Sequence, residues 1–130
     1  AGEAQALGLC AEDARRVDAL EAFVARKLMA FGNNDYGQLG DGSTTNRSNP
    51  VEVAGLGDDI LQAATGTNHT VVLKADGRVM AFGYNSNGQL GDGSTTHRST
   101  PVEVAGLGRD NAQLAAGAYH TLVLAAVAGP

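Results

Sequence analysis

A tandem repeat is the feature that most constrains this chain. Met29–Leu73 aligns without a gap on Met80–Leu124 at an offset of 51 residues, and 32 of the 45 paired positions are identical. Chance does not produce identity at this level, so the sequence contains two copies of one structural unit. Any fold for the chain therefore has to repeat with the same period.

Each copy contains four short segments that favour β-strands. They are rich in β-branched and aliphatic residues and are bounded by turn residues. The Asp76-Gly77 pair between two of them is typical of a hairpin turn, because both residues tolerate a positive φ. The eight predicted strands are 28–31, 50–53, 60–64, 70–73, 79–82, 101–104, 112–116 and 121–124.

Chain order makes the four strands between residues 60 and 105 an antiparallel meander. Four antiparallel strands repeated about every 50 residues indicate the blades of a β-propeller. Two predicted strands precede this complete blade and two follow it. The sequence therefore predicts an all-β fold, a partial β-propeller of about two four-stranded antiparallel blades, divided as one complete blade between two half-blades.

Several motifs recur in the same order in both copies and resemble a known repeat. They are GQLGDG (37–42 and 88–93), Pro-Val-Glu-Val, and the G-x-x-H of Gly66–His69 and Gly117–His120; the hairpin ADGRVMAFG (75–83), which occurs once, fits the same pattern. Together they look like the repeat of the regulator of chromosome condensation (RCC1), with one repeat at 28–78 and a second at 79–124. The resemblance implies a propeller, usually of about seven blades.

The resemblance also implies three functional settings. They are a guanine-nucleotide exchange factor for a small GTPase, the regulatory propeller of a ubiquitin ligase, and a secreted propeller of the β-lactamase-inhibitor type. In this family exchange activity is implied to need a complete propeller face and a wedge inserted in one blade, and neither repeat here has an insertion. We therefore expect a non-catalytic protein-interaction scaffold, with exchange activity and ligase regulation as the alternatives.

The segments that flank the repeats predict other structure. Residues 1–10 are expected to form a flexible leader and residues 125–130 a tail. Residues 11–27 predict one N-terminal amphipathic α-helix that covers an exposed blade edge or, alternatively, docks a partner. Its acidic start and basic end suit the helix dipole, and its apolar stripe consists of Val17, Leu20, Val24 and Leu28.

The glycine-rich GQLGDG loop is predicted to be structural. A phosphate-binding loop needs Lys followed by Ser or Thr, and a dinucleotide-binding loop opens a helix; the sequence has neither feature. DGSTT supplies one carboxylate and lacks the closing acid of a calcium loop. We expect the glycines to adopt positive φ, Leu39 to enter the core, and Asp41 to accept hydrogen bonds from turn amides.

The two repeated histidines are also predicted to be structural. His69 and His120 are equivalent positions without Cys or Asp at metal-ligand spacing, so we expect each to bond loop backbone and hold a turn of its blade. No nucleophile motif occurs. No catalytic, cofactor-binding or metal-binding residue is predicted, and the chain is expected not to be an enzyme. The predicted structural motif consists of Gly37, Gln38, Leu39, Gly40, Gly66, His69, Gly88, Gln89, Leu90, Gly91, Gly117 and His120.

Positions that differ between the copies are the candidate partner contacts, because loops carry binding groups on a rigid frame. His97 replaces Asn46 in an otherwise similar loop, and we expect it to be exposed and free to vary. The candidate partner-contact residues are Asn33, Asp35, Tyr36, Asn46, Tyr84, Ser86, Asn87, His97 and Tyr119.

Composition narrows the kind of partner. The chain has 14 acidic and 9 basic residues, a net charge of −5, which argues against a nucleic-acid partner. No apolar run is long enough to span a bilayer, so no membrane partner is expected. The single cysteine, Cys10, favours a reducing, intracellular compartment. We expect a protein partner and no cofactor.

The half-blades leave strand edges and apolar faces uncovered, which invites association. Two arrangements would cover these edges and faces. Either the chain is a fragment of a larger propeller that supplies the missing blades, or copies associate with one another head to tail through the half-blades.

Overall fold

The computed structural model describes residues 24–126, which contain eight β-strands and no helix. All eight strands coincide with predicted ones. β2 and β6 begin three residues earlier than predicted, because pairing resumes beyond a bulge, where Gly32 pairs with Arg47 and Gly83 with Arg98. The strands are β1 (Met29–Gly32), β2 (Arg47–Glu52), β3 (Ile60–Thr65), β4 (His69–Lys74), β5 (Val79–Gly83), β6 (Arg98–Glu103), β7 (Asn111–Ala116) and β8 (Thr121–Ala125).

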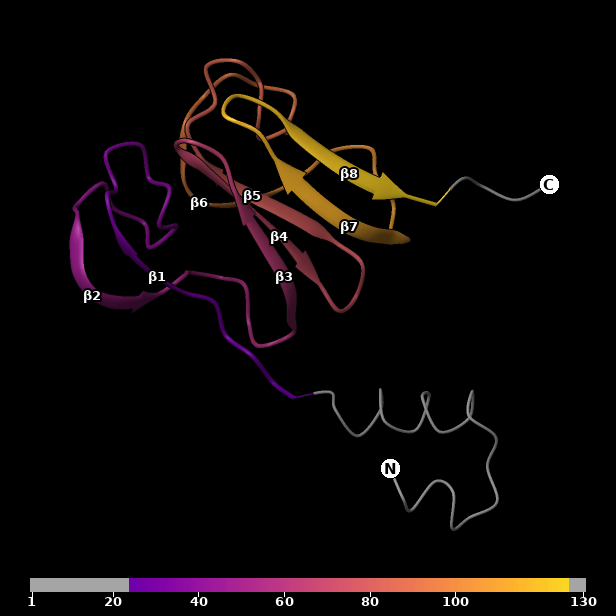
Figure 1. Cartoon of the computed structure of the whole chain (residues 1–130), viewed down its shortest axis with the longest axis horizontal. Coiled ribbons are helices and arrows are strands. Elements are labelled where there is room, and N and C mark those ends of the chain that lie inside the picture. Colours follow the sequence, from indigo (N-terminus) through magenta and orange to yellow (C-terminus); the bar gives the residue numbers. More distant parts are fainter. Residues whose placement is uncertain (1–23, 127–130) are drawn as a thin grey trace, which may run out of the picture.

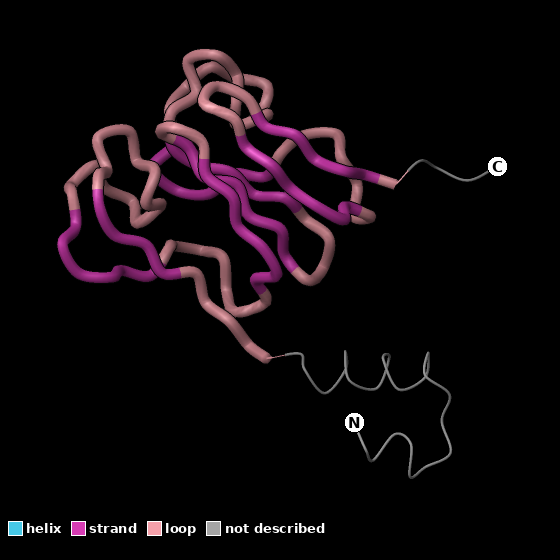
Figure 2. Tube along the Cα trace, viewed as in Figure 1, coloured by secondary structure: helices cyan, strands magenta, loops and turns pink. Residues whose placement is uncertain are grey.

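The strands form three antiparallel sheets, in the orders β1-β2, β3-β4-β5-β6 and β7-β8. We call β3–β6 the complete blade, β1–β2 the N-terminal half-blade and β7–β8 the C-terminal half-blade. The half-blades lie on opposite sides of the complete blade (Figure 1). This confirms the predicted meander and its two flanking strand pairs. Figure 2 shows that the long loops after β1 and β5 leave the sheets at the same end.

The core lies in two layers, one on each face of the complete blade. Neighbouring residues of β4 and β5 alternate between the layers, as the two-residue period of a strand requires. The layer toward the C-terminal half-blade contains Val71, Leu73, Val79, Ala81, Leu90 and Leu114. The layer toward the N-terminal half-blade contains Val53, Leu56, Ile60, Val72 and Phe82, with Leu28 and Ala30 packed against it. A blade face is thus buried only where a neighbouring sheet covers it.

The turn between β4 and β5 is the predicted hairpin. The amide of Lys74 donates to the Arg78 carbonyl at 3.0 Å, and Gly77 has a φ of 90°. A Cβ at Gly77 would also overlap the Arg109 carbonyl oxygen. Glycine is required here by both conformation and space.

The described end of the predicted helix is not helical. Residues 11–23 lie outside the described residues, but 24–27 form no helix, and Arg26 makes a parallel bridge with Asp59. The Arg26 amide donates to the Asp58 carbonyl at 2.6 Å. Leu28 packs against the core layer at Phe82. The prediction was wrong over 24–27 because Leu28, assigned to a helical stripe, belongs to the β-core.

Candidate functional site

The loops after β1 and β5 carry most of the candidate residues, and each is built around a fully buried asparagine. In the first loop the Asn34 side chain donates to the carbonyls of Ser43 and Thr45, both at 3.0 Å, and accepts from the Leu39 amide at 2.9 Å. In the second loop Asn85 makes the equivalent bonds to Ser94, Thr96 and Leu90. The buried side-chain amide thus pairs with backbone N–H and C=O groups that, in a regular strand, would be paired with a neighbouring strand.

The GQLGDG glycines and leucine adopt their predicted roles. Gly37, Gly40 and Gly42 have φ values of 81°, 68° and 86°, and Leu39 is buried. Asp41 accepts a hydrogen bond from the Ser43 amide at 2.9 Å, as predicted for a turn aspartate. The loop is a structural frame in both copies.

An ion pair between a buried aspartate side chain and a partly exposed arginine completes each loop. Arg47 Nε donates to Asp41 Oδ2 at 2.8 Å, and Arg98 makes the same contact with Asp92 at 2.9 Å. Burial alone would raise the pKa of each aspartate, but hydrogen bonds from the loop serine, arginine and asparagine outweigh it. They lower the pKa of Asp41 and of Asp92 to about 2.

Acid is expected to weaken the fold through these two aspartates. Because the folded pKa lies below the ordinary value of 3.8, their contribution is complete above pH 4 and is lost as the pH falls toward 2. Each aspartate should contribute about 2 kcal/mol. Denaturant unfolding between pH 5 and 2 should therefore show a shallower loss of stability in Asp92→Asn, and equally in Asp41→Asn, than in the wild type. Equal slopes in all three proteins would contradict this assignment.

His69 links the complete blade to the next half-blade. Its ring is buried, 1% exposed, and Nε2 lies 3.0 Å from Thr121 Oγ1. The Thr121 hydroxyl donates its only hydrogen to the Gln89 carbonyl at 2.8 Å, so His69 has to donate Nε2–H. Burial lowers the pKa of His69, which a backbone hydrogen bond with His120 partly opposes. The prediction placed a bond from this ring on the loop backbone of its own blade, whereas the ring bonds a hydroxyl of the neighbouring sheet.

Gln38 and Gln89 occupy equivalent positions but differ in their partners. The Gln38 amide donates to Asn33 at 3.1 Å and to Asn68 at 3.2 Å. At the two corresponding positions the second copy has Tyr84 and Tyr119. Gln89 Nε2 is buried, and no acceptor among residues 24–126 lies within hydrogen-bonding distance of it. The second copy has exchanged two hydrogen-bond acceptors for two tyrosines.

Three aromatic candidates meet between the two loops. Tyr84 and His97 stack with ring centroids 4.7 Å apart, and Tyr36 from the first loop approaches both edge-on, at 4.8 Å and 5.3 Å. We call Tyr36, Tyr84 and His97 the aromatic cluster. His97 is exposed, as predicted, and its Nδ1 accepts a hydrogen bond from the Asn85 amide at 2.9 Å. Asn46 plays this part in the first copy, accepting from Asn34 at 2.7 Å.

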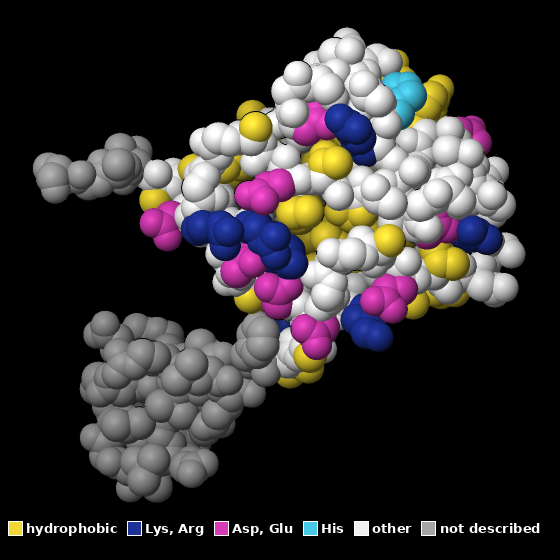
Figure 3. All heavy atoms as spheres, turned by 180° about the vertical axis from the view of Figure 1, so that it is seen from behind, with side chains coloured by type: hydrophobic (Ala, Val, Ile, Leu, Met, Phe, Trp, Pro, Cys, Tyr) yellow, Lys and Arg dark blue, Asp and Glu magenta, His cyan; other side chains and the backbone are white. Residues whose placement is uncertain are grey.

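The other candidate contacts are exposed and more dispersed. Asn33 and Asp35 bond each other at 3.3 Å in the first loop, and Ser86 is exposed in the second. Asn87 and Tyr119 line a shared cleft of about 340 Å³ between the complete blade and the C-terminal half-blade. The face drawn in Figure 3 shows Lys and Arg side chains beside Asp and Glu, with apolar side chains between them.

The central asparagines were not among the predicted residues. Asn34 and Asn85 are identical in a stretch where the residues on either side differ between the copies (Asn33 and Asp35 against Tyr84 and Ser86). This isolated identity is the sequence feature that could have pointed to the two asparagines. Thr70 and Thr121, which bond the carbonyls of Gln38 and Gln89, were also not among the predicted residues, although each directly follows a predicted histidine.

Among residues 24–126 no group of three or more His, Cys, Asp or Glu side chains is placed to hold a metal ion. Within the same range no helix is long and apolar enough to cross a bilayer.

Comparison with known proteins connects this geometry to a family. The regulator of chromosome condensation (RCC1) repeat matches residues 27–73 and 76–124. The protein RCC2 homolog of Danio rerio is 38% identical over 100 residues, covering 75% of this chain and 20% of the relative. The probable E3 ubiquitin-protein ligase HERC4 of Mus musculus is 43% identical over 81 residues, covering 61% of this chain and 8% of the relative. The chain thus spans a fifth or less of the length of these relatives.

A solved structure has a similar fold. The crystal structure of human WBSCR16 superimposes with a TM-score of 0.65 at 26% sequence identity, covering 79% of this chain and 28% of that one. The fold is thus a fragment of an RCC1-like propeller. With two matched repeats in tandem, the chain belongs to the RCC1 repeat family.

Proposed function

We propose that this chain is a non-catalytic protein-interaction segment of a larger RCC1-repeat propeller. Its partner is a protein that contacts the aromatic cluster and Tyr119. The remaining exposed candidates, Asn33, Asp35, Asn46, Ser86 and Asn87, form the polar surroundings of this surface.

The observation that carries the proposal is the orphaned amide of Gln89. In the first copy two asparagines satisfy the equivalent amide, whereas Tyr84 and Tyr119 leave Gln89 Nε2 buried without an acceptor. A buried unsatisfied donor costs about 1–3 kcal/mol. Sequences retain such local costs mainly at functional positions. Tyrosine is also the residue type that most often anchors protein interfaces, since it offers a large contact area and a polar tip.

Replacing both tyrosines by asparagine should separate stability from binding. Tyr84→Asn together with Tyr119→Asn restores the acceptors of Gln89 but removes the ring contacts of Tyr84 with His97 and Tyr36, so the free energy of unfolding should stay within about 1 kcal/mol of the wild-type value. Proteins captured by the immobilised chain and quantified by mass spectrometry should fall in the same variant. Thr95→Ala, an exposed position of the same loop that is identical in both copies, is the control and should change neither quantity. Undiminished capture by the folded double variant would overturn the proposed surface.

Two catalytic settings are the alternatives. A segment of a ubiquitin ligase is supported by the 43% identity to HERC4, but the match covers 8% of that protein. Exchange activity on a small GTPase is the other. A nucleotide-exchange assay with small GTPases distinguishes exchange activity from the non-catalytic function. Clear stimulation of exchange by this chain alone would overturn the non-catalytic assignment.

A further inference from the structure

The aromatic cluster contains one residue whose charge changes near neutral pH. Histidine side chains gain a proton between about pH 8 and pH 5, and His97 is the only histidine in the sequence of the two loops. We propose that the aromatic cluster is an acid-sensitive binding surface, which is assembled while His97 is neutral and comes apart when this ring takes up a proton. The inference rests on the proposed function, because it concerns the regulation of the same surface.

His97 is held in place by a hydrogen bond that only the neutral ring accepts. The Asn85 amide donates to His97 Nδ1 at 2.9 Å. An unprotonated ring nitrogen accepts such a bond, whereas both nitrogens of the protonated ring carry a hydrogen and act as donors. Turning the ring over about its Cβ–Cγ bond does not supply an acceptor, because it places the carbon Cδ2 where Nδ1 was. The bond is therefore lost when His97 is protonated.

Loss of this bond leaves a donor unpaired in the centre of the second loop. Asn85 is fully buried, and its side chain holds the loop through bonds to Leu90, Ser94 and Thr96. A buried amide without an acceptor is unfavourable. Protonation thus favours a conformation in which the loop opens at His97 and water reaches the Asn85 amide.

The first copy makes the same bond with a side chain that does not titrate. Asn46 occupies the position of His97, and its Oδ1 accepts from the Asn34 amide at 2.7 Å. A side-chain amide oxygen remains an acceptor when the pH changes. The two loops are built alike around Asn34 and Asn85. The exchange of Asn46 for His97 therefore makes the second loop sensitive to acid and leaves the first loop insensitive.

The position of the His97 ring decides whether the three aromatic side chains meet. His97 stacks on Tyr84 with ring centroids 4.7 Å apart, and Tyr36 contacts both rings edge-on. Aromatic pairs of this geometry stabilise an arrangement beyond the area that they bury. When His97 moves away, Tyr84 loses its stacked partner and Tyr36 loses one of its two contacts.

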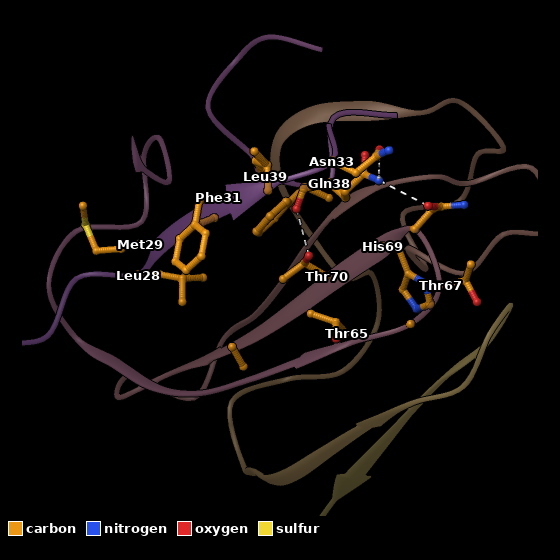
Figure 4. Close-up of a pocket in the computed structure, with 15 residues that line it drawn as sticks. Leu28, Met29, Phe31, Asn33, Gln38, Leu39, Thr65, Thr67, His69 and Thr70 are labelled. Atoms are coloured by element: carbon orange, nitrogen blue, oxygen red, sulfur yellow. Dashed lines mark hydrogen bonds between the residues drawn. The ribbon is translucent and has the colours of Figure 1, made fainter. Parts of the chain in front are cut away.

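The side of the cluster that belongs to the first loop is fixed by groups that keep their charge. The Tyr36 amide donates to Gln38 Oε1 at 2.8 Å. Figure 4 shows Gln38 bonded to Asn33, to which its amide donates at 3.1 Å, and to Thr70, whose hydroxyl donates to its carbonyl at 2.9 Å. These amide and hydroxyl groups do not titrate near neutral pH. Acid therefore acts on the His97 side of the cluster.

The charged neighbours of His97 are paired within their loops. The two loops and the arginines that follow them carry five charged side chains, Asp35, Asp41, Arg47, Asp92 and Arg98. The pKa values of Asp41 and Asp92 are about 2, and these carboxylates pair with Arg47 and Arg98. Asp35, beside Tyr36, accepts a hydrogen bond from Asn33 at 3.3 Å. Proton uptake by His97 thus adds a positive charge to a loop whose other charges are already matched.

Amide hydrogen exchange followed by NMR tests the bond directly and needs no partner. The protection factor compares the exchange rate of an amide with that of an unfolded chain at the same pH. For the Asn85 amide it should fall roughly three- to tenfold between about pH 7.5 and 5.5. The Asn34 amide of the same molecule is the internal control and should keep its protection factor. This comparison separates the effect of His97 from that of His69 and His120.

Exchanging the two acceptors tests whether His97 is the cause. His97→Asn gives the second loop the acceptor of the first, so the Asn85 amide should stay protected at about pH 5.5. Asn46→His gives the first loop the acceptor of the second, so the Asn34 amide should lose protection over the same range. Both positions are exposed, so each loop should accommodate the exchange.

Capture at two pH values tests the regulation of binding. Proteins whose capture is lost in the double tyrosine variant are quantified on the immobilised chain at about pH 7.5 and 5.5. Their capture by the wild type should fall roughly threefold or more at the lower pH, in line with the loss of one buried hydrogen bond. In His97→Asn the ratio of the two captured amounts should be close to one, whatever its capture at the higher pH.

Three results would contradict the proposal. They are an Asn85 protection factor that does not change with pH, an equal fall for Asn34 and Asn85, and equal capture of the tyrosine-dependent proteins at both pH values. The exchange measurements give their result whether or not such proteins are found. Failure of the proposed surface and failure of the His97 bond are therefore distinguishable.

Discussion

Asn85→Ala is expected to lower the free energy of unfolding by about 3 kcal/mol, because several buried polar groups lose their partner at once. The Leu90 amide loses its acceptor, and the carbonyls of Ser94 and Thr96 lose their donor. The Asp92 carboxylate also loses a hydrogen bond at 3.2 Å. Because Asn85 is fully buried, water does not replace these bonds without opening the loop. Urea unfolding followed by circular dichroism measures the change.

The neighbouring Asn87 provides the control. It is exposed, and only its backbone amide bonds within the loop, to Gln89 at 2.9 Å. Asn87→Ala should therefore change the free energy of unfolding by less than about 0.5 kcal/mol. Asn34→Ala should repeat the large loss, since its bonds are equivalent. Similar midpoints for Asn85→Ala and Asn87→Ala would contradict the central role of the buried asparagine.

Phe82→Ala is expected to cost about 3–5 kcal/mol, the range found when a buried aromatic ring is truncated to a methyl group. Phe82 is fully buried in the layer between the complete blade and the N-terminal half-blade. Its partners Val53 and Leu56 come from the loop side and Val72 from the sheet, so they are too constrained to close the cavity. Thermal and urea unfolding should both show the loss.

The equivalent residue of the first copy is the matched control. Phe31 has the same sequence neighbours but is 65% exposed. At a concentration where light scattering finds one chain per particle, Phe31→Ala should cost less than about 1 kcal/mol. Equal losses at the two positions would mean that Phe31 is as well buried as Phe82, which would contradict the exposed position of Phe31 in this structure.

The strands and their order could be predicted because their signals are local or repeated. Val71–Leu73 and Val79–Phe82 are β-rich segments joined by Asp76-Gly77, and the hairpin forms as that pattern predicts. The repeat then transfers each assignment to the other copy. The left-handed glycines of GQLGDG and the burial of Leu39 were predictable for the same reason, since turn chemistry acts over a few residues.

The contacts between loops and between sheets were not predictable. The side chain of Asn34 bonds groups up to 11 residues away, and His69 bonds Thr121 across 52 residues, so neither interaction leaves a spacing pattern. The aromatic cluster depends on how the two loops lie together in space. The assignment of 24–27 to a helix failed because its apolar spacing suits both a helix and an extended edge that meets a sheet.

The buried asparagine also has a consequence for how the number of repeats changes during evolution. The side-chain bonds of Asn34 end at residues 39, 41, 43 and 45, inside its own repeat. The hydrogen bonds of this buried side chain therefore close within one repeat. Contacts between the repeats include the apolar faces, the hydrogen bond between His69 and Thr121, the aromatic cluster and single bonds such as that from the Gly42 amide to the Ser99 carbonyl. Duplication of one repeat in a gene copies a loop together with the side-chain bonds that hold it. The number of repeats can therefore change by duplication, provided that another sheet covers the apolar face of the last one.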